Sequence, residues 1–159
     1  MWGGGHRSLS DRWTEGRRAS PIPRDVTFTA DERVVKLRSL QHVSSRYPEG
    51  EAASVRKFYG EVLGLREQPI PSTLAAMRLV WFSAGDGLEL HFFPGPPDVK
   101  SERHFCFDID DLEETRRGLQ EAGLSPYDAV PIPNRPRFFC RDPVGNLIEF
   151  TRIEGDYRT

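Results

Sequence analysis

One order of elements occurs twice along the chain, and each repeat begins with a histidine in a strand-like segment. His42 lies in the first such segment, which precedes an amphipathic stretch of helical period that ends at Gly64. His104 lies in the second, before a similar stretch that ends near Gly123. Each repeat then closes on further strands. This order predicts an α+β fold made of two strand–helix–strand–strand–strand modules, with a site built between the two halves.

The hydrophobic pattern places the individual elements. Val55, Phe58, Tyr59 and Val62 form one apolar stripe of helical spacing. In the first half we expect a helix over residues 51–63 and strands over 37–45, 65–68, 77–83 and 88–93. In the second half we expect a helix over residues 111–122 and strands over 104–109, 126–130, 137–141 and 147–152. The predicted organisation is a tail (1–36), one domain (37–153) with modules 37–97 and 98–153, and a second tail (154–159).

Composition excludes several function classes. The 159 residues carry a formal net charge of −2, which points neither to nucleic acid nor to an anionic membrane surface. No apolar stretch approaches the ~20 residues that a membrane-spanning helix needs, and the N-terminal residues contain no apolar segment typical of a secretory signal. Cys106 and Cys140 lie in apolar runs and are interpreted as reduced, buried thiols of a cytoplasmic protein.

Carboxylates accompany the two histidines. Glu149 lies between Ile148 and Phe150, and the period of two in a strand points it away from both apolar neighbours. It is either a solvent-facing glutamate or a buried ligand, since an unpaired buried carboxylate is costly. Glu89 and His91 are two residues apart and therefore share one face of a strand. Imidazole and carboxylate together suit a divalent cation that keeps open positions for substrate.

Three segments, in the correct order, resemble the vicinal oxygen chelate superfamily, which comprises glyoxalase, bleomycin resistance and extradiol dioxygenase proteins. They are residues 137–149 (RFFCRDPVGNLIE), 58–65 (FYGEVLGL) and 40–43 (LQHV). The resemblance covers residues 37–153 and is greatest to uncharacterised glyoxalase-like members. It implies paired βαβββ modules that form curved mixed sheets around a shared metal-site cavity. The metal ligands that it implies are His42, Glu89, His104 and Glu149.

The resemblance also implies a chemistry. A divalent nickel, zinc, cobalt, manganese or ferrous ion would act on two vicinal oxygens of a small substrate, as in glyoxalase-type lyases and isomerases. Glu149 or Glu89 would also serve as the base that moves a proton between adjacent carbons. His91 could replace Glu89 or line the cavity as an acid or base. Some relatives use only three protein ligands, two histidines and one carboxylate. A dioxygenase or another metal-dependent activity is a further alternative.

Substrate contacts are predicted at Arg46, His91 and Phe139. Arg46 matches an arginine that binds the glutathione carboxylate in glyoxalase I relatives, but Phe93 departs from the asparagine that those relatives favour. The use of a thiol such as glutathione as a co-substrate is therefore left open. Phe139 departs from the tyrosine of fosfomycin-modifying relatives and is interpreted as cavity wall. This chain lacks the tyrosine and the histidine that act as proton donors in the extradiol dioxygenases. We expect a homodimer and no nucleic-acid or membrane partner, and the modules could pair within a chain or across two.

A non-catalytic alternative is a bleomycin-resistance-like protein that sequesters an aromatic or cationic molecule. Six aromatic side chains could line such a groove, although core packing is their default role: Trp81, Phe82, Phe92, Phe93, Phe138 and Phe139. Relatives of that kind generally lack the complete ligand set that this chain keeps. That set favours the enzyme.

Overall fold

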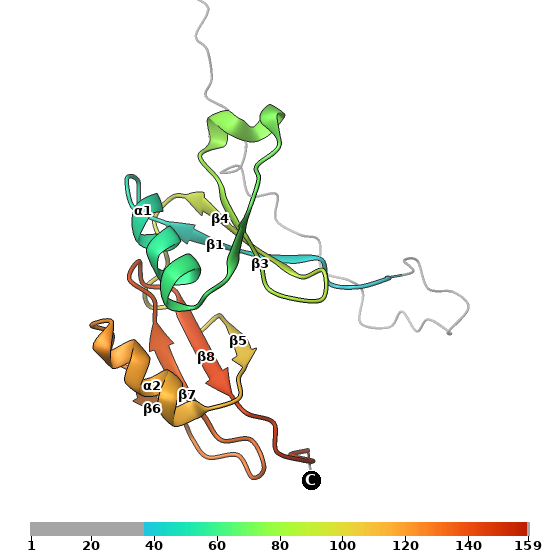
Figure 1. Cartoon of the computed structure of the whole chain (residues 1–159), viewed down its shortest axis with the longest axis vertical. Coiled ribbons are helices and arrows are strands. Elements are labelled where there is room, and N and C mark those ends of the chain that lie inside the picture. The colour runs from blue at the N-terminus through green and yellow to red at the C-terminus, as the bar shows by residue number, and fades with distance from the viewer. Residues whose placement is uncertain (1–36, 159) are drawn as a thin grey trace, which may run out of the picture. The chain divides into compact units, whose positions relative to one another are not determined.

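The computed structural model describes residues 37–158, which form two βαβββ modules. The elements of the first module are β1 (His42–Tyr47), α1 (Ala52–Val55), π-helix η3 (Arg56–Val62), β2 (Arg66–Gln68), 3₁₀-helix η4 (Ser72–Met77), β3 (Val80–Ser83) and β4 (Glu89–Pro94). Those of the second module are β5 (His104–Asp108), α2 (Leu112–Glu121), β6 (Tyr127–Asp128), β7 (Arg137–Arg141) and β8 (Leu147–Thr151). The predicted α+β class and the repeated element order are confirmed (Figure 1).

Each module contains one mixed four-stranded sheet, and the two sheets share the same topology. The strand orders are β1-β4-β3-β2 and β5-β8-β7-β6. In both sheets the first strand pairs in parallel with the last, and the remaining neighbours pair antiparallel. The first strand of each module therefore lies beside its closing strand, so that each histidine strand is next to a carboxylate strand.

Alternation along the strands separates a core face from a polar face in each sheet. Leu90 and Phe92 of β4 are buried, whereas His91 between them is only partly buried. Phe138 and Cys140 of β7 follow the same rule in the second sheet. Figure 1 shows α2 beside the strands of its own module, and Leu119 of that helix is a buried core residue.

The helix predicted over residues 51–63 is helical, but most of it is not an α-helix. Only α1 is α-helical, and η3 continues it with wider π turns closed by hydrogen bonds such as that from Leu63 N–H to the Phe58 carbonyl (2.9 Å). Phe58 and Tyr59 both enter the core, where they are 1% and 0% exposed, as expected for neighbouring positions of the apolar stripe.

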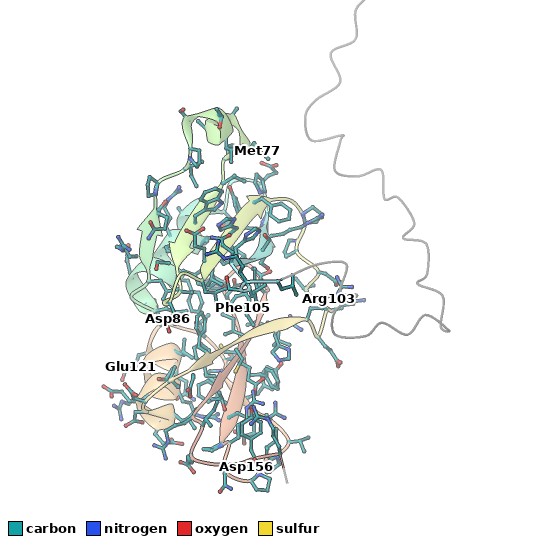
Figure 2. The ribbon with its side chains drawn as sticks, turned by 90° about the vertical axis from the view of Figure 1, so that its right-hand side faces the viewer. Met77, Asp86, Arg103, Phe105, Glu121 and Asp156 are labelled. Carbon is teal, nitrogen blue, oxygen red and sulfur yellow. The ribbon has the colours of Figure 1, made fainter. Side chains whose placement is uncertain are left out.

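Several predicted strands are shorter in the structure, because part of each predicted range has no neighbouring strand to pair with. The first strand begins at His42 and not at residue 37, since its pairing with β4 starts with His42 opposite Glu89, and Leu37 and Leu40 are exposed. The strand predicted over 126–130 shortens to β6, which pairs at only two positions. The 3₁₀-helix η4 was not predicted, and Figure 2 places its last residue, Met77, at the outer end of the first module.

A polar network connects the modules. The Tyr59 hydroxyl donates to Asp142 Oδ2 (2.8 Å), and the Ser45 hydroxyl donates to Asn146 Oδ1 (2.6 Å). Asn146 Nδ2 in turn donates to Asp142 Oδ2 (2.9 Å). Phe105, labelled in Figure 2, adds an apolar contact, its ring centroid lying 6.2 Å from that of Tyr59. The Asp-Pro turn of the second module thus stabilises the junction as well as joining β7 to β8.

Predictions for the first 36 residues, including the tail itself, lie outside the described residues. The division into modules 37–97 and 98–153 and the C-terminal tail stay predictions. No helix within residues 37–158 is long and apolar enough to cross a membrane.

Candidate functional site

The polar face of the first sheet carries a stack of three rings from three neighbouring strands. Trp81 of β3 lies opposite His91 of β4 in the sheet register. Their rings are 4.0 Å apart at the centroids and 7° from parallel. His42 of β1 continues the stack on His91, at 4.3 Å and 9°. The sheet therefore holds His42 in place through His91 and Trp81.

Hydrogen bonds fix the polar atoms around this stack. His91 Nε2 lies 2.7 Å from Glu89 Oε2, and His42 Nδ1 lies 2.7 Å from the side-chain oxygen of Gln41. Because an amide oxygen only accepts, His42 donates from Nδ1 and presents the lone pair of Nε2. The pKa of Glu89 is lowered, first by its hydrogen bond from His91 and then by that from Gln41. Glu89 therefore holds its negative charge on a carboxylate that accepts hydrogen bonds from His91 and Gln41.

The ring stack shows what His91 contacts. Its ring lies face to face with that of His42, and its Nε2 is hydrogen-bonded to Glu89. Whether His91 replaces Glu89 as a ligand or lines the cavity stays a prediction.

The second sheet pairs His104 of β5 with Glu149 of β8. His104 Nε2 lies 3.0 Å from Glu149 Oε2, and His104 Nδ1 lies 2.8 Å from the backbone carbonyl of Glu102. The carbonyl accepts from Nδ1–H, and Nε2 faces a carboxylate oxygen. A proton or another cation between Nε2 and Oε2 stabilises this contact, because each of the two atoms carries a lone pair. This pair has the donor chemistry of a metal site.

Glu149 is buried, with a relative exposure of 3%, so the solvent-facing interpretation was wrong. Its burial is explained by two arginines that the sequence analysis did not select. Arg135 Nη2 and Arg137 Nη1 each lie 3.2 Å from Oε1 of Glu149. The two oxygens of the carboxylate thus have different partners: Oε1 faces the guanidinium groups and Oε2 faces His104. Paired charges of this kind offset much of the cost of burial.

The predicted substrate residues lie beside these groups. Phe139 packs edge-on against His104, with ring centroids 5.1 Å apart. The guanidinium carbon of Arg137 lies over the Phe139 ring, 5.4 Å from its centroid. Arg46 stacks on Phe93 at 5.3 Å, on the same polar face of the first sheet as His42. All three predicted positions, including His91, therefore share a sheet face with a predicted ligand.

Two sequence interpretations need correction. Cys106 is exposed, because it alternates with the buried-side residues of β5 and lies opposite Glu149, whereas Cys140 is buried as expected. Half of the proposed aromatic groove is core: Phe82, Phe92 and Phe138 are at most 1% exposed. Trp81, Phe93 and Phe139 remain on the polar faces.

The described part of one chain does not assemble the four predicted ligands. Within residues 37–158 no three His, Cys, Asp or Glu side chains form a group that could hold a metal ion. A cavity of about 730 Å³ lies elsewhere, lined by residues such as Leu63, Phe107 and Thr115 and by none of the predicted ligands. The structure thus contains two half-sites, which we define as His42 with Glu89 and His104 with Glu149.

Some functional residues could have been found from sequence. Arg137 lies two residues before Phe139 and twelve before Glu149, so strand alternation and a β7–β8 hairpin place Arg137 and Glu149 on one face. Trp81 could have been selected by the same reasoning, from the β3–β4 hairpin that puts it opposite His91. Arg135 lies in a loop before β7, where no period applies.

Comparison with known proteins identifies relatives. The family model of the Glyoxalase/Bleomycin resistance protein/Dioxygenase superfamily matches residues 39–150. A structure of a protein described as a glyoxalase family member from Bacillus anthracis is 30% identical, with a TM-score of 0.67, and the match covers 75% of this chain and 98% of that one. No curated protein matches the chain.

Two more distant structures share the fold. A glyoxalase/dioxygenase from Nostoc punctiforme is 23% identical with a TM-score of 0.62, and the match covers 88% of this chain and all (100%) of that one. The fosfomycin resistance protein FosX from Mesorhizobium loti is 17% identical with a TM-score of 0.59, over 74% of this chain and 93% of its own.

Proposed function

The chain belongs to the glyoxalase/bleomycin resistance protein/dioxygenase superfamily, and we propose that it is a metal-dependent enzyme of the glyoxalase-like lyase or isomerase type. Its substrate would be a small molecule with two vicinal oxygens. The observation that carries this proposal is the His104–Glu149 pair, in which a ring nitrogen and a carboxylate oxygen face each other at 3.0 Å. His104 Nδ1 donates to the Glu102 carbonyl, so Nε2 is the ring nitrogen that would bind a cation.

The residues present fit a divalent ion. His42 and His104 would each supply Nε2, and Glu89 and Glu149 would each supply a carboxylate oxygen. Nitrogen and oxygen donors of this kind accept nickel, zinc, cobalt, manganese or ferrous iron. When bound, the ion would act as a Lewis acid that stabilises negative charge developing on the substrate oxygens.

The environments of the two carboxylates favour different roles. Glu149 is buried, with a side-chain exposure of 4%, and two guanidinium groups occupy its Oε1. Glu89 contacts no arginine in its hydrogen bonds and is accessible, with a side-chain exposure of 29%. We assign the proton transfer between adjacent substrate carbons to Glu89 and the holding role to Glu149. Phe139 and Arg46 would line the substrate space beside the half-sites.

Two copies of the chain would complete the site. The half-sites lie on the polar faces of different sheets, and one chain does not bring three of the donors together within its described residues. A homodimer in which the first module of one copy faces the second module of its partner would unite His42 and Glu89 with His104 and Glu149 twice, by symmetry.

A mixing experiment tests this arrangement. His42→Ala and His104→Ala chains are prepared separately, then unfolded and refolded together. In a mixed dimer with shared sites, one site receives both mutations and the other receives neither. Metal binding should therefore return to about a quarter of the wild-type level in an equal mixture. Sites confined to one chain would give no recovery.

Metal analysis tests the proposal as a whole. Protein purified without chelator should hold about one divalent ion per chain, and His42→Ala and His104→Ala should each lose it. His91→Phe keeps a ring in the stack and is the matched control, which should retain the ion. Loss of metal in the control equal to that in His42→Ala would contradict the ligand assignment.

Activity is screened with 2-oxoaldehydes on metal-loaded protein, with and without glutathione or other thiols. Glu89→Gln should retain most of the metal while lowering turnover by about 10²–10⁴-fold, the usual cost of losing a general base. Glu149→Gln should lose both. Absence of metal-dependent turnover together with tight binding of an aromatic or cationic drug would replace this proposal with sequestration.

A further inference from the structure

The surroundings of Glu149 contain more positive charge than negative charge. Arg135 and Arg137 are both within 3.2 Å of Oε1, and the only carboxylate that they contact is Glu149 among the described residues. Both side chains are partly buried, with side-chain exposures of 22% for Arg135 and 16% for Arg137. One carboxylate neutralises one of these charges. The arginine pair (Arg135 and Arg137) therefore keeps a surplus of one positive charge at a partly buried position.

The arginine pair also keeps unused donors. Arg137 Nε is buried and has no hydrogen-bond partner in the described chain. A buried donor without an acceptor costs about 1–3 kcal/mol, so a persistent one in a native fold indicates an acceptor that joins it. The rest of the Arg137 guanidinium is fixed, because its Nη2 donates to the Val130 carbonyl (3.1 Å) and the guanidinium packs over Phe139. The guanidinium is thus held in position independently of Glu149.

We infer that the arginine pair is an anion subsite, which takes a carboxylate or a tetrahedral oxyanion carried by the substrate. Guanidinium groups bind both kinds of anion through paired, charge-assisted hydrogen bonds. The inference rests on the proposed function only for the identity of that substrate. Since the arginines contact Oε1 and the proposed ion would bind Oε2 of the same carboxylate, the anionic group would lie within a few bonds of the vicinal oxygens. The expected substrate class is small oxygenated acids, in contrast to neutral aldehydes.

The test uses metal-free wild-type protein, so that it does not depend on the proposed metal. Inorganic phosphate, acetate and neutral acetamide are titrated, and binding is followed by calorimetry and by the ¹H–¹⁵N signals of arginine Nε–H groups. Phosphate or acetate should bind and shift the Arg137 signal, and acetamide should do neither. The ratio of phosphate to acetate affinity distinguishes a tetrahedral from a carboxylate preference.

Variants separate anion binding from simple neutralisation of Glu149. Arg137→Gln should weaken binding about tenfold or more, the usual cost of one charge-assisted contact. Arg152→Gln removes an arginine that is paired with Glu154 on the surface and should change nothing. Glu149→Gln removes the competing carboxylate and should tighten binding. If Arg137→Gln does not fold, the comparison is made between Glu149→Gln and the double variant Arg137→Gln/Glu149→Gln, whose affinity should be lower.

Equal anion affinity in wild type, Arg137→Gln and Arg152→Gln would overturn the inference, and so would an unchanged affinity in Glu149→Gln. Its failure is distinguishable from failure of the proposed function. Anion binding in a protein that takes up no divalent ion would leave the subsite in place and remove the enzyme proposal, whereas metal binding without anion binding would do the reverse.

Discussion

Replacing Tyr59 by phenylalanine removes one buried hydrogen bond between the modules and leaves the ring in place. Tyr59 is 0% exposed and donates to Asp142 Oδ2, which also accepts from Asn146 Nδ2. A hydrogen bond to a charged group contributes about 1.5–3 kcal/mol. Because Oδ2 keeps its second donor in the variant, we expect a loss near the lower end, about 1.5–2 kcal/mol.

This loss of unfolding free energy corresponds to a decrease in the melting temperature. A folded unit of about 120 residues has an unfolding entropy of about 0.25 kcal/mol/K, so Tyr59→Phe should lower Tm by about 6–8 °C. Thermal and urea unfolding measure it. Tyr127→Phe is the matched control, since Tyr127 is 47% exposed, and it should stay within about 0.5 kcal/mol of wild type. Equal shifts in the two variants would refute a net contribution of the Tyr59–Asp142 bond.

The same contact predicts a pH dependence. Burial raises the pKa of Asp142, and hydrogen bonds from Asn146 and Tyr59 offset part of that effect. The folded chain then keeps the Asp142 proton at pH values where the unfolded chain has released it. The free energy of unfolding contributed by this group therefore falls as pH rises from the unfolded pKa through the folded pKa. In Tyr59→Phe this fall should extend to higher pH. In Asp142→Asn it should be absent, and an unchanged pH profile in both variants would contradict the assignment.

Two smaller predictions follow from local geometry. Gly145→Ala should destabilise the protein by about 1 kcal/mol more than Gly64→Ala. Both glycines have positive φ, but a Cβ at Gly145 would lie 2.5 Å from Val99 Cγ1, whereas a Cβ at Gly64 would meet nothing within 4 Å. Urea unfolding measures the difference, and equal losses would refute the prediction. A thiol reagent at pH 8 should label Cys106 in the folded protein, and Cys140 only on unfolding, because Cys140 is buried and its pKa is raised to about 11 by burial; mass spectrometry after partial labelling identifies the site.

The fold was predictable wherever a local period survives into the structure. The strand over residues 137–141 was located to the residue, since Phe138 and Cys140 alternate with partly exposed neighbours. The helix predicted to begin at residue 111 also has its start there, because the Asp111 side chain caps it by accepting from the Glu114 backbone N–H at 2.9 Å. The π-helix was not predictable in the same way. The apolar stripe predicts a helical segment, but it does not distinguish π turns from α turns.

The candidate site was predictable as a set of strand positions and not as an assembly. Alternation within each strand, together with the parallel pairing of β5 with β8, places His104 and Glu149 on one face of one sheet. Whether a donor from the first sheet meets a donor from the second depends on how whole modules pack. No periodicity within a strand carries that information, and the motif resemblance supplied the four-ligand set without its geometry.

The contrast between the carboxylates shows what the three-dimensional contacts add to such a motif. From sequence, Glu89 and Glu149 were interchangeable as ligand or base. Arg135 approaches from a loop that follows no strand period, and with Arg137 it gives Glu149 two guanidinium partners that Glu89 lacks. A carboxylate enclosed by two guanidinium groups is suited to a fixed holding role, whereas the more accessible Glu89 can reach a substrate proton. Role division within the pair thus follows from the placement of two arginines that no ligand motif includes.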